Sequence, residues 1–171
     1  RKERASGSSK PRSANAAPFL AKSFEAASVP LGGRTRLSFS LSNPNAGTAL
    51  SSLAFTDVLP AGLVVASPNQ LTGSCGAGTI TAVAGSATVA LSGGTLAAGG
   101  ACTFSVALTA TGMGSKNNTT GTVSSAEGAT GAAASASIEV TEAVPVPAAG
   151  RIGLAVLGLL LAALAVAVLR R

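Results

Sequence analysis

Few side chains in this sequence are of the types that carry out chemistry. The chain of 171 residues has two cysteines, six acidic residues and no histidine. Without histidine, a Ser-His or Cys-His pair, in which the imidazole activates the nucleophile, cannot form. Glu139 and Glu142 do not make a general acid/base pair, because their spacing of three places them on opposite faces of a strand. The residue types therefore argue against an enzyme, and no cofactor is implied.

Cys75 and Cys102 have three possible uses: a disulfide, two free buried thiols or a pair of metal ligands. A metal site needs further ligands, and the sequence offers neither histidine nor a third cysteine. A disulfide would close the loop between the two positions and stabilise a small domain by about 3–4 kcal/mol. We expect the disulfide, with free thiols as the alternative, and a disulfide implies an oxidising compartment.

Two further polar groups are candidate sites. Asp57 is not expected to bind calcium, which needs six or more oxygen ligands, because no acidic cluster surrounds it in the sequence. We expect a local bond of its carboxylate or of its backbone to shape the corner "FTDVLPAGL". The stretch "NNTT" holds overlapping glycosylation sequons at Asn117 and Asn118. We expect these amides to serve instead as hydrogen-bonding groups of a loop or strand edge.

The net charge of +6 comes from the ends of the chain. Residues 1–12 hold five basic residues against one acidic residue, and residues 143–171 hold three basic residues. The remaining 13–142 hold four basic against five acidic residues, so the body is nearly neutral. A nucleic-acid-binding domain would show a basic face and stacking aromatics, whereas this chain has no Trp or Tyr. No nucleic-acid partner is expected.

The body of the chain has the alternation of half-buried strands. Four stretches place apolar residues at every second position: "RLSFSLSN", "SATVALSGG", "CTFSVALT" and "ASIEVTE". Their inward residues are Leu37, Phe39 and Leu41; Ala87, Val89 and Leu91; Cys102, Phe104, Val106 and Leu108; and Ile138 and Val140. Turn signals separate them at 32–33, 42–47, 60–62, 93–94 and 99–100. The pattern predicts an all-β sandwich or barrel over 19–142.

Three blocks of the body resemble a known family. They are "SFEAASVPLGGRTRLSFSLSNPN" (23–45), "LSSLAFTDVLPAGLVVA" (52–66) and "LSGGTLAAGGACTFSVALTATGMGSKNNTTGTVSS" (91–125). They resemble, in order, the domain-of-unknown-function-eleven repeats of bacterial surface proteins. The resemblance implies an immunoglobulin-like β-sandwich on an exported protein and no chemistry.

The segments that flank the body differ from it in composition. Residues 1–18 are basic and rich in Ser, Ala and Pro, so we expect a disordered linker, with a basic arm for anionic lipid, wall polymer or nucleic acid as the alternative. Residues 143–150 contain two prolines and predict an extended linker. Residues 152–169 contain no charge and include seven Leu, three Val and one Ile. At about 1.5 Å per residue they are just long enough for one transmembrane helix within 151–171.

The predicted anchor residues are Ile152, Leu157, Leu160, Leu164 and Leu169. Arg170 and Arg171 are expected to stay on the cytoplasmic side, which leaves the β-domain outside the cytoplasm. Arg151 on the other flank and the basic arm favour the opposite orientation, and the cysteine pair favours export. Membrane lipid is therefore an expected partner, and the expected location is the cell envelope.

The tail is also similar to the PEP-CTERM and IPTL-CTERM sorting signals, which combine a proline-containing motif, one apolar helix and a terminal Arg cluster. The motif here is Val144, Pro145, Val146 and Pro147. The resemblance implies a sorting protease as a partner. Together these features predict a non-catalytic, membrane-anchored structural or adhesion module of a bacterial surface. A cleaved and released precursor, or a module that binds carbohydrate or another surface protein, remains the alternative.

Overall fold

The structure of this chain is a computed structural model that describes residues 15–143. The predicted sorting motif, the anchor residues and the terminal arginine pair lie outside these residues, as does most of the basic linker. The strands are β1 (Phe19–Phe24), β2 (Ser28–Pro30), β3 (Arg34–Ser42), β4 (Leu50–Val58), β5 (Leu63–Val65), β6 (Thr72–Ser74), β7 (Thr79–Thr81), β8 (Thr88–Leu96), β9 (Ala101–Ala110), β10 (Gly114–Thr119) and β11 (Ser135–Thr141).

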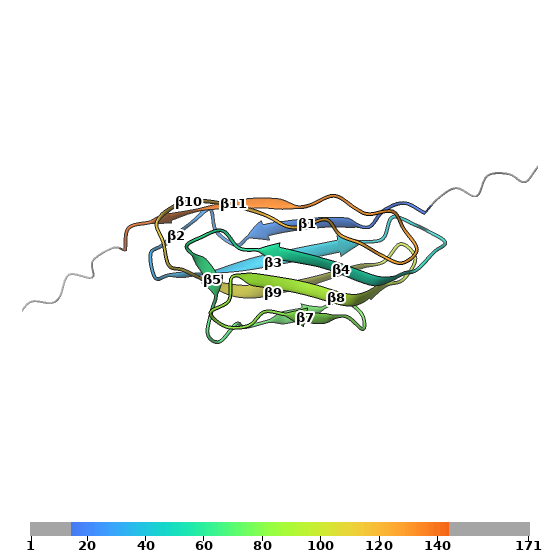
Figure 1. Cartoon of the computed structure of the whole chain (residues 1–171), viewed down its shortest axis with the longest axis horizontal. Helices are drawn as coiled ribbons and strands as arrows, with labels where there is room; N and C mark the ends of the chain where they lie inside the picture. The colour runs from blue at the N-terminus through green and yellow to red at the C-terminus, as the bar shows by residue number, and fades with distance from the viewer. Residues whose placement is uncertain (1–14, 144–171) are drawn as a thin grey trace, which may run out of the picture.

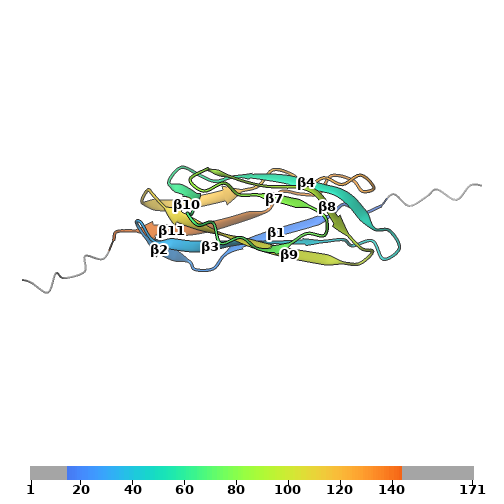
Figure 2. The same cartoon turned by 90° about the horizontal axis from the view of Figure 1, so that it is seen from below.

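The strands form two layers (Figures 1 and 2). One layer is a sheet in the order β1-β3-β9-β5, in which the short β6 also pairs with β9. The other layer combines the three-stranded sheets β10-β11-β2 and β4-β8-β7. Single bridges between Asp57 and Thr120 and between Ala54 and Ser124 join these two sheets along the inner edge of β4. The expected all-β sandwich is confirmed.

The beginning of the chain contributes to both layers. β1 pairs antiparallel with β3 in the first layer, and after Phe24 the chain crosses to the second, where β2 pairs parallel with β11. The last strand, β11, therefore runs in the same direction as the first. Both views show the two ends of the described chain at opposite ends of an elongated domain, blue at one end and orange at the other (Figures 1 and 2).

The alternation seen in the sequence forms the core. Leu37, Phe39 and Leu41 of β3 are buried, and the register of β3 on β9 sets Phe39 directly opposite Phe104. The rings of these two phenylalanines stack with centroids 4.9 Å apart. Phe55 of β4 reaches them from the other layer, with its centroid 5.2 Å from that of Phe39. These three rings, called the aromatic centre below, hold the two layers together.

Two local expectations are wrong. The predicted turn at Gly93–Gly94 lies inside β8, where the pairing with β4 shifts register and Gly93 has a φ of 66°. This is a β-bulge, in which a glycine adopts a backbone conformation that other residues avoid. The bulge lets β8 continue to Leu96. Ala87 was expected to face inward but is exposed, because β8 begins one residue after it.

Residues 15–18, which the sequence placed in the disordered linker, are fixed to the domain. The side chain of Asn45 accepts a hydrogen bond from the backbone N–H of Ala16 at 2.8 Å and donates one to its carbonyl oxygen at 2.9 Å. Asn15 adds a bond from its side chain to the carbonyl of Glu127 at 3.0 Å. These partners are distant in the sequence, so composition did not reveal them. Among residues 15–143 there is no apolar helix long enough to span a bilayer.

Candidate functional site

Three polar side chains occupy inward-facing positions on three different strands. Lys22 lies between Leu20 and Phe24 on the core-facing side of β1. Asp57 follows Leu53 and Phe55 on the core-facing side of β4, and Asn118 is the buried residue of β10. The alternation that buries apolar residues elsewhere therefore buries these three polar groups. We refer to Lys22, Asp57 and Asn118 as the polar cluster.

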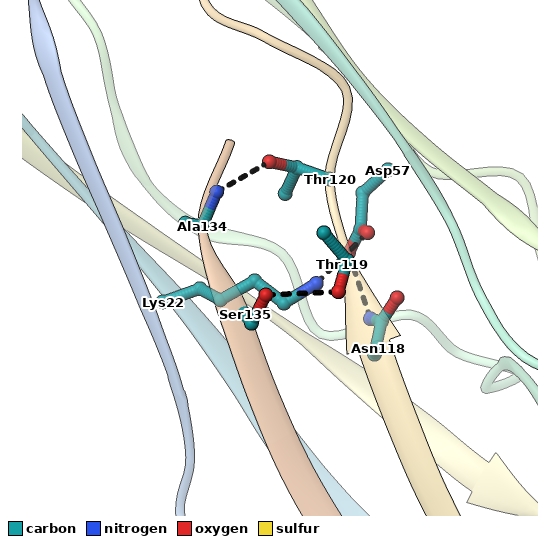
Figure 3. Close-up of polar contacts among 7 residues, drawn as sticks. All are labelled: Lys22, Asp57, Asn118, Thr119, Thr120, Ala134 and Ser135. Atoms are coloured by element: carbon teal, nitrogen blue, oxygen red, sulfur yellow. Dashed lines mark hydrogen bonds and ion pairs between the residues drawn. The ribbon is translucent and has the colours of Figure 1, made fainter. Parts of the chain in front are cut away.

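The carboxylate of Asp57 joins the other two side chains (Figure 3). Its Oδ1 lies 2.9 Å from Nζ of Lys22, and its Oδ2 accepts a hydrogen bond of 2.9 Å from Nδ2 of Asn118. The side chains of Lys22 and Asp57 are fully buried, and Asn118 is 1% exposed. One carboxylate thus holds an amine nitrogen on one oxygen and an amide nitrogen on the other.

Burial dominates the electrostatics of the cluster. It lowers the pKa of Lys22, because removing the ammonium from water disfavours the charged form; the hydrogen bond and the charge of Asp57 act in the opposite direction. Nζ also lies 5.9 Å from the centre of the Phe39 ring, whose face attracts a cation. A buried ion pair of this kind gives little net stability, because desolvation offsets the attraction.

One atom of the cluster has no partner. The Oδ1 of Asn118 is buried and accepts no hydrogen bond, although the Nδ2 of the same amide is bonded. Leaving a buried acceptor unpaired destabilises the fold by about 1–3 kcal/mol. Buried polar atoms are almost always paired in native proteins, so this oxygen requires an explanation.

The backbone around the cluster is held tightly. The N–H of Thr120 donates to the carbonyl of Ala134 at 2.9 Å, and the N–H of Ala134 donates to Oγ1 of Thr120 at 2.9 Å. Thr119 and Ser135 share a hydroxyl hydrogen bond of 2.8 Å on the opposite face (Figure 3). These contacts fix the end of β10 against β11 and so fix the position of Asn118.

The structure corrects the expected role of Asp57. Its carboxylate makes no local bond at the "FTDVLPAGL" corner and instead contacts residues 35 and 61 positions away in the sequence. Asn118, expected at a loop or strand edge, is in the interior. Neither Lys22 nor the interior position of Asn118 was predicted from the sequence. The signal was present in "FLAKSF", where period two puts a lysine on the apolar face.

The other residues considered in the sequence lie apart from the cluster. Glu139 on β11 and Glu142 just beyond it are both exposed. Within residues 15–143 no group of three His, Cys, Asp or Glu side chains is arranged to hold a metal ion. The polar cluster is thus the place in the described chain where reactive group types are buried together.

The predicted bridge between Cys75 and Cys102 is present. The Cα atoms lie 5.1 Å apart, within the usual range for a disulfide. It ties the loop after β6 to the start of β9, and the carbonyl of Cys75 accepts hydrogen bonds from Gly78 and Thr95. Cys75 is fully buried among the apolar core residues.

The fold is that of immunoglobulin-like sandwich domains known from bacterial proteins. A cohesin module from a Clostridium perfringens family 33 glycoside hydrolase has 13% identity and a TM-score of 0.53, covering 77% of this chain and all of that one. The major pilin subunit BcpA of Bacillus cereus has 11% identity and a TM-score of 0.52, covering 73% of this chain and 40% of the pilin. The bacterial hydrophobin BslA has 14% identity and a TM-score of 0.51, covering 77% of this chain and 99% of BslA.

The chain belongs to the family described as "Domain of unknown function (DUF7933)", whose model matches residues 18–140. This is a different family from the domain-of-unknown-function-eleven repeats that the sequence blocks resemble. No curated protein sequence matches the chain significantly. At such low identities the solved structures establish the fold alone.

Proposed function

We propose that this chain is a non-catalytic structural module of a bacterial cell envelope, which spaces other parts of a surface protein from the membrane. In this proposal residues 151–171 form a membrane anchor with Arg170 and Arg171 in the cytoplasm, and the β-domain lies outside it. The finer points of the proposal, namely the anchor, the orientation and the sorting motif Val144–Pro147, rest on the sequence.

The arrangement of the chain ends carries the proposal. Because β1 and β11 run in the same direction, the chain enters the domain at one end of its long axis and leaves at the other (Figures 1 and 2). Such a domain adds its full length to the distance between the segments before and after it. A domain with both ends at one side would add almost nothing.

The buried disulfide supports placement outside the cytoplasm. Disulfides persist in oxidising compartments and are rare where thiols are kept reduced. The Cys75–Cys102 bridge joins two segments that are distant in the sequence, and Cys75 lies in the core. The bridge is therefore part of the folded structure. The similarity to a pilin subunit and to cohesin modules agrees with a role in surface structure or protein attachment.

The arrangement of the aromatic residues favours a structural role over sugar binding. Stacking of sugar rings needs exposed aromatic side chains on one face. Phe39, Phe55 and Phe104 are buried, whereas Phe19, at the start of β1, is 63% exposed. A protein partner or a polysaccharide held by polar groups remains compatible with this surface.

Protease treatment of intact cells tests the proposal. We expect external protease to remove the β-domain from cells that produce the full chain, and a thiol reagent applied to the denatured protein to label the two cysteines only after reduction. A cytoplasmic protein produced in the same cells serves as the control and should stay intact. Protection of the β-domain in intact cells, together with free thiols, would overturn the proposal.

The mass of the mature C-terminus separates a permanent anchor from a sorting tag. A chain that ends at Arg171 and fractionates with membranes supports the anchor. A chain that ends within 144–150 and is recovered outside the membrane shows that the tail is removed, and it refutes permanent anchoring while leaving surface placement intact.

A further inference from the structure

We propose that Lys22 and Asn118 join in an intramolecular amide bond between Nζ and Cγ, formed inside the folded domain with Asp57 as the proton-transfer group and ammonia as the product. This reaction would be a self-modification of the domain and is independent of where the chain is located.

The first observation is that one carboxylate touches both nitrogens that the reaction exchanges. Nζ of Lys22, the nucleophile, is 2.9 Å from Oδ1 of Asp57. Nδ2 of Asn118, the leaving group, is 2.9 Å from Oδ2. Proton transfer needs a group within hydrogen-bond reach of the atom that gains or loses the proton, and Asp57 meets this requirement for both nitrogens.

The second observation is the burial of the cluster. The side chains of Lys22 and Asp57 are fully buried, so an unprotonated amine is formed more readily here than in water. An amine becomes a nucleophile when desolvation or a neighbouring base removes its proton. Three strands of a folded domain hold the reacting groups in place, which replaces a bimolecular encounter by a unimolecular step.

The reaction balances without any other reagent. The ammonium of Lys22 gives a proton to Asp57, and the free Nζ attacks Cγ of Asn118, whose C=O electrons move to Oδ1. Asp57 then protonates Nδ2, the C=O bond re-forms, and the Cγ–Nδ2 bond breaks to release ammonia. Asp57 finally accepts the second proton from Nζ. The products are a secondary amide, a neutral Asp57 carboxyl and ammonia.

The products remove the two unfavourable features of the starting cluster. The buried ion pair disappears, because both Lys22 and Asp57 become neutral. The carbonyl oxygen of Asn118, which has no partner in the structure, can accept a hydrogen bond from the protonated carboxyl of Asp57. The unpaired acceptor is thus explained as the oxygen of the group that is attacked.

The competing bond, between Lys22 and Asp57 with loss of water, is disfavoured. It would consume the carboxylate that has to move the protons, and no second carboxylate lies in the cluster. It would also attack a carboxylate anion, a poorer electrophile than a neutral amide. The two reactions release different molecules, so mass spectrometry separates them.

The test uses the full chain, purified in detergent and reduced to open the disulfide. We expect the intact mass to be lower than the sequence mass by one ammonia. Trypsin should leave residues 13–34 uncut after Lys22 and joined to residues 117–151, and fragmentation should place the branch at Lys22 and Asn118. Linear peptides 13–22 and 23–34 from folded protein would overturn the proposal, and so would a loss of water in place of ammonia.

Variants assign the roles within the cluster. Lys22→Arg and Asn118→Ala should have the unreacted mass, and Asp57→Asn should abolish or strongly slow the cross-link. Lys116→Arg and Asn117→Ala, the neighbouring positions on β10, should retain it. Circular dichroism shows which variants fold. A cross-link that persists in folded Asp57→Asn would refute the role of Asp57, and the wild-type mass decides the bond itself even if a variant fails to fold.

Discussion

The aromatic centre and the polar cluster are adjacent parts of one core that are held together by different forces. In the aromatic centre, Phe39, Phe55 and Phe104 join the layers through apolar burial and ring contacts. In the polar cluster, Lys22, Asp57 and Asn118 occupy equivalent inward positions but contribute charges and amide groups. Phe39 connects the two regions, since Nζ of Lys22 lies 5.9 Å from the centre of its ring.

The difference shows that an inward position does not by itself serve stability. Burying the three rings removes apolar area from water at no electrostatic cost, which stabilises the fold directly. Burying an ion pair and an unpaired carbonyl instead gives a small or negative net contribution. Three buried polar residues in contact therefore suggest a reaction between them, and the proposed Lys22–Asn118 amide bond is such a reaction.

The largest expected effect comes from removing a ring of the aromatic centre. Phe39→Ala leaves a cavity between the layers and removes the ring next to Nζ of Lys22. We therefore expect a loss of about 3–5 kcal/mol in the free energy of unfolding. Phe19→Ala is the matched control, because that ring is 63% exposed and should change stability little. Urea unfolding measures both. Equal effects at the two positions would mean that the aromatic centre does not hold the layers.

The disulfide, like the aromatic centre, is part of the apolar core. Replacing Cys75 and Cys102 by alanine should lower the free energy of unfolding by about 3–4 kcal/mol, mainly by giving freedom to the unfolded loop. Adding reductant to the wild-type protein should shift the denaturation midpoint in the same direction and leave that of the double variant unchanged. A wild-type midpoint that ignores reductant would show that the bridge is not formed in solution.

Breaking the ion pair tests the polar side. Asp57→Ala leaves Lys22 buried without a partner, whereas the double variant Lys22→Met/Asp57→Leu leaves no charge. Since neither variant retains the carboxylate that the cross-link needs, they can be compared directly. We expect Asp57→Ala to be less stable than the double variant by about 3 kcal/mol. This is the low end for a broken buried pair, because Lys22 can release its proton and so avoid a buried charge. Equal stability would show that the lysine reaches water.

The smallest effect concerns a charge outside both regions. Glu127 is exposed, and its carboxylate accepts hydrogen bonds from the N–H and the hydroxyl of Ser51, which lower its pKa below the ordinary 4.5. Its folded pKa is the lower one, so its contribution is present above the unfolded pKa and is lost as pH falls through the folded value. Glu127→Gln should flatten this acid limb in urea titrations. An unchanged limb in Glu127→Gln would show that the Ser51 contact does not persist.

The sequence predicted the features that depend on local periodicity. The alternation in 36–43 and 102–109 identified β3 and β9 and their buried residues, because a period of two can be recognised within each strand by itself. The cysteine pairing also followed from a short list of alternatives. The bulge at Gly93 escaped prediction, since a glycine pair has the same local signature whether the strand turns there or continues.

The polar cluster required information that no single segment contains. Lys22, Asp57 and Asn118 meet only because β10 lies beside β4 in one layer and β1 belongs to the layer that faces it, and this arrangement follows from how three distant strands pack. A lysine within an apolar alternation was the available clue, but its partners could not be named from it. The same holds for β2, whose three residues pair with the last strand of the chain, which is distant in sequence.

The pairing of β2 with β11 has a consequence for the order in which the domain can fold. Synthesis from the N-terminus delivers Ser28–Pro30 long before Ser135–Thr141. Until β11 is available, β2 has no strand to pair with, and the β10-β11-β2 sheet cannot form. Folding of this layer therefore cannot be completed before nearly the whole domain is available, and β2 waits for a partner that is made last.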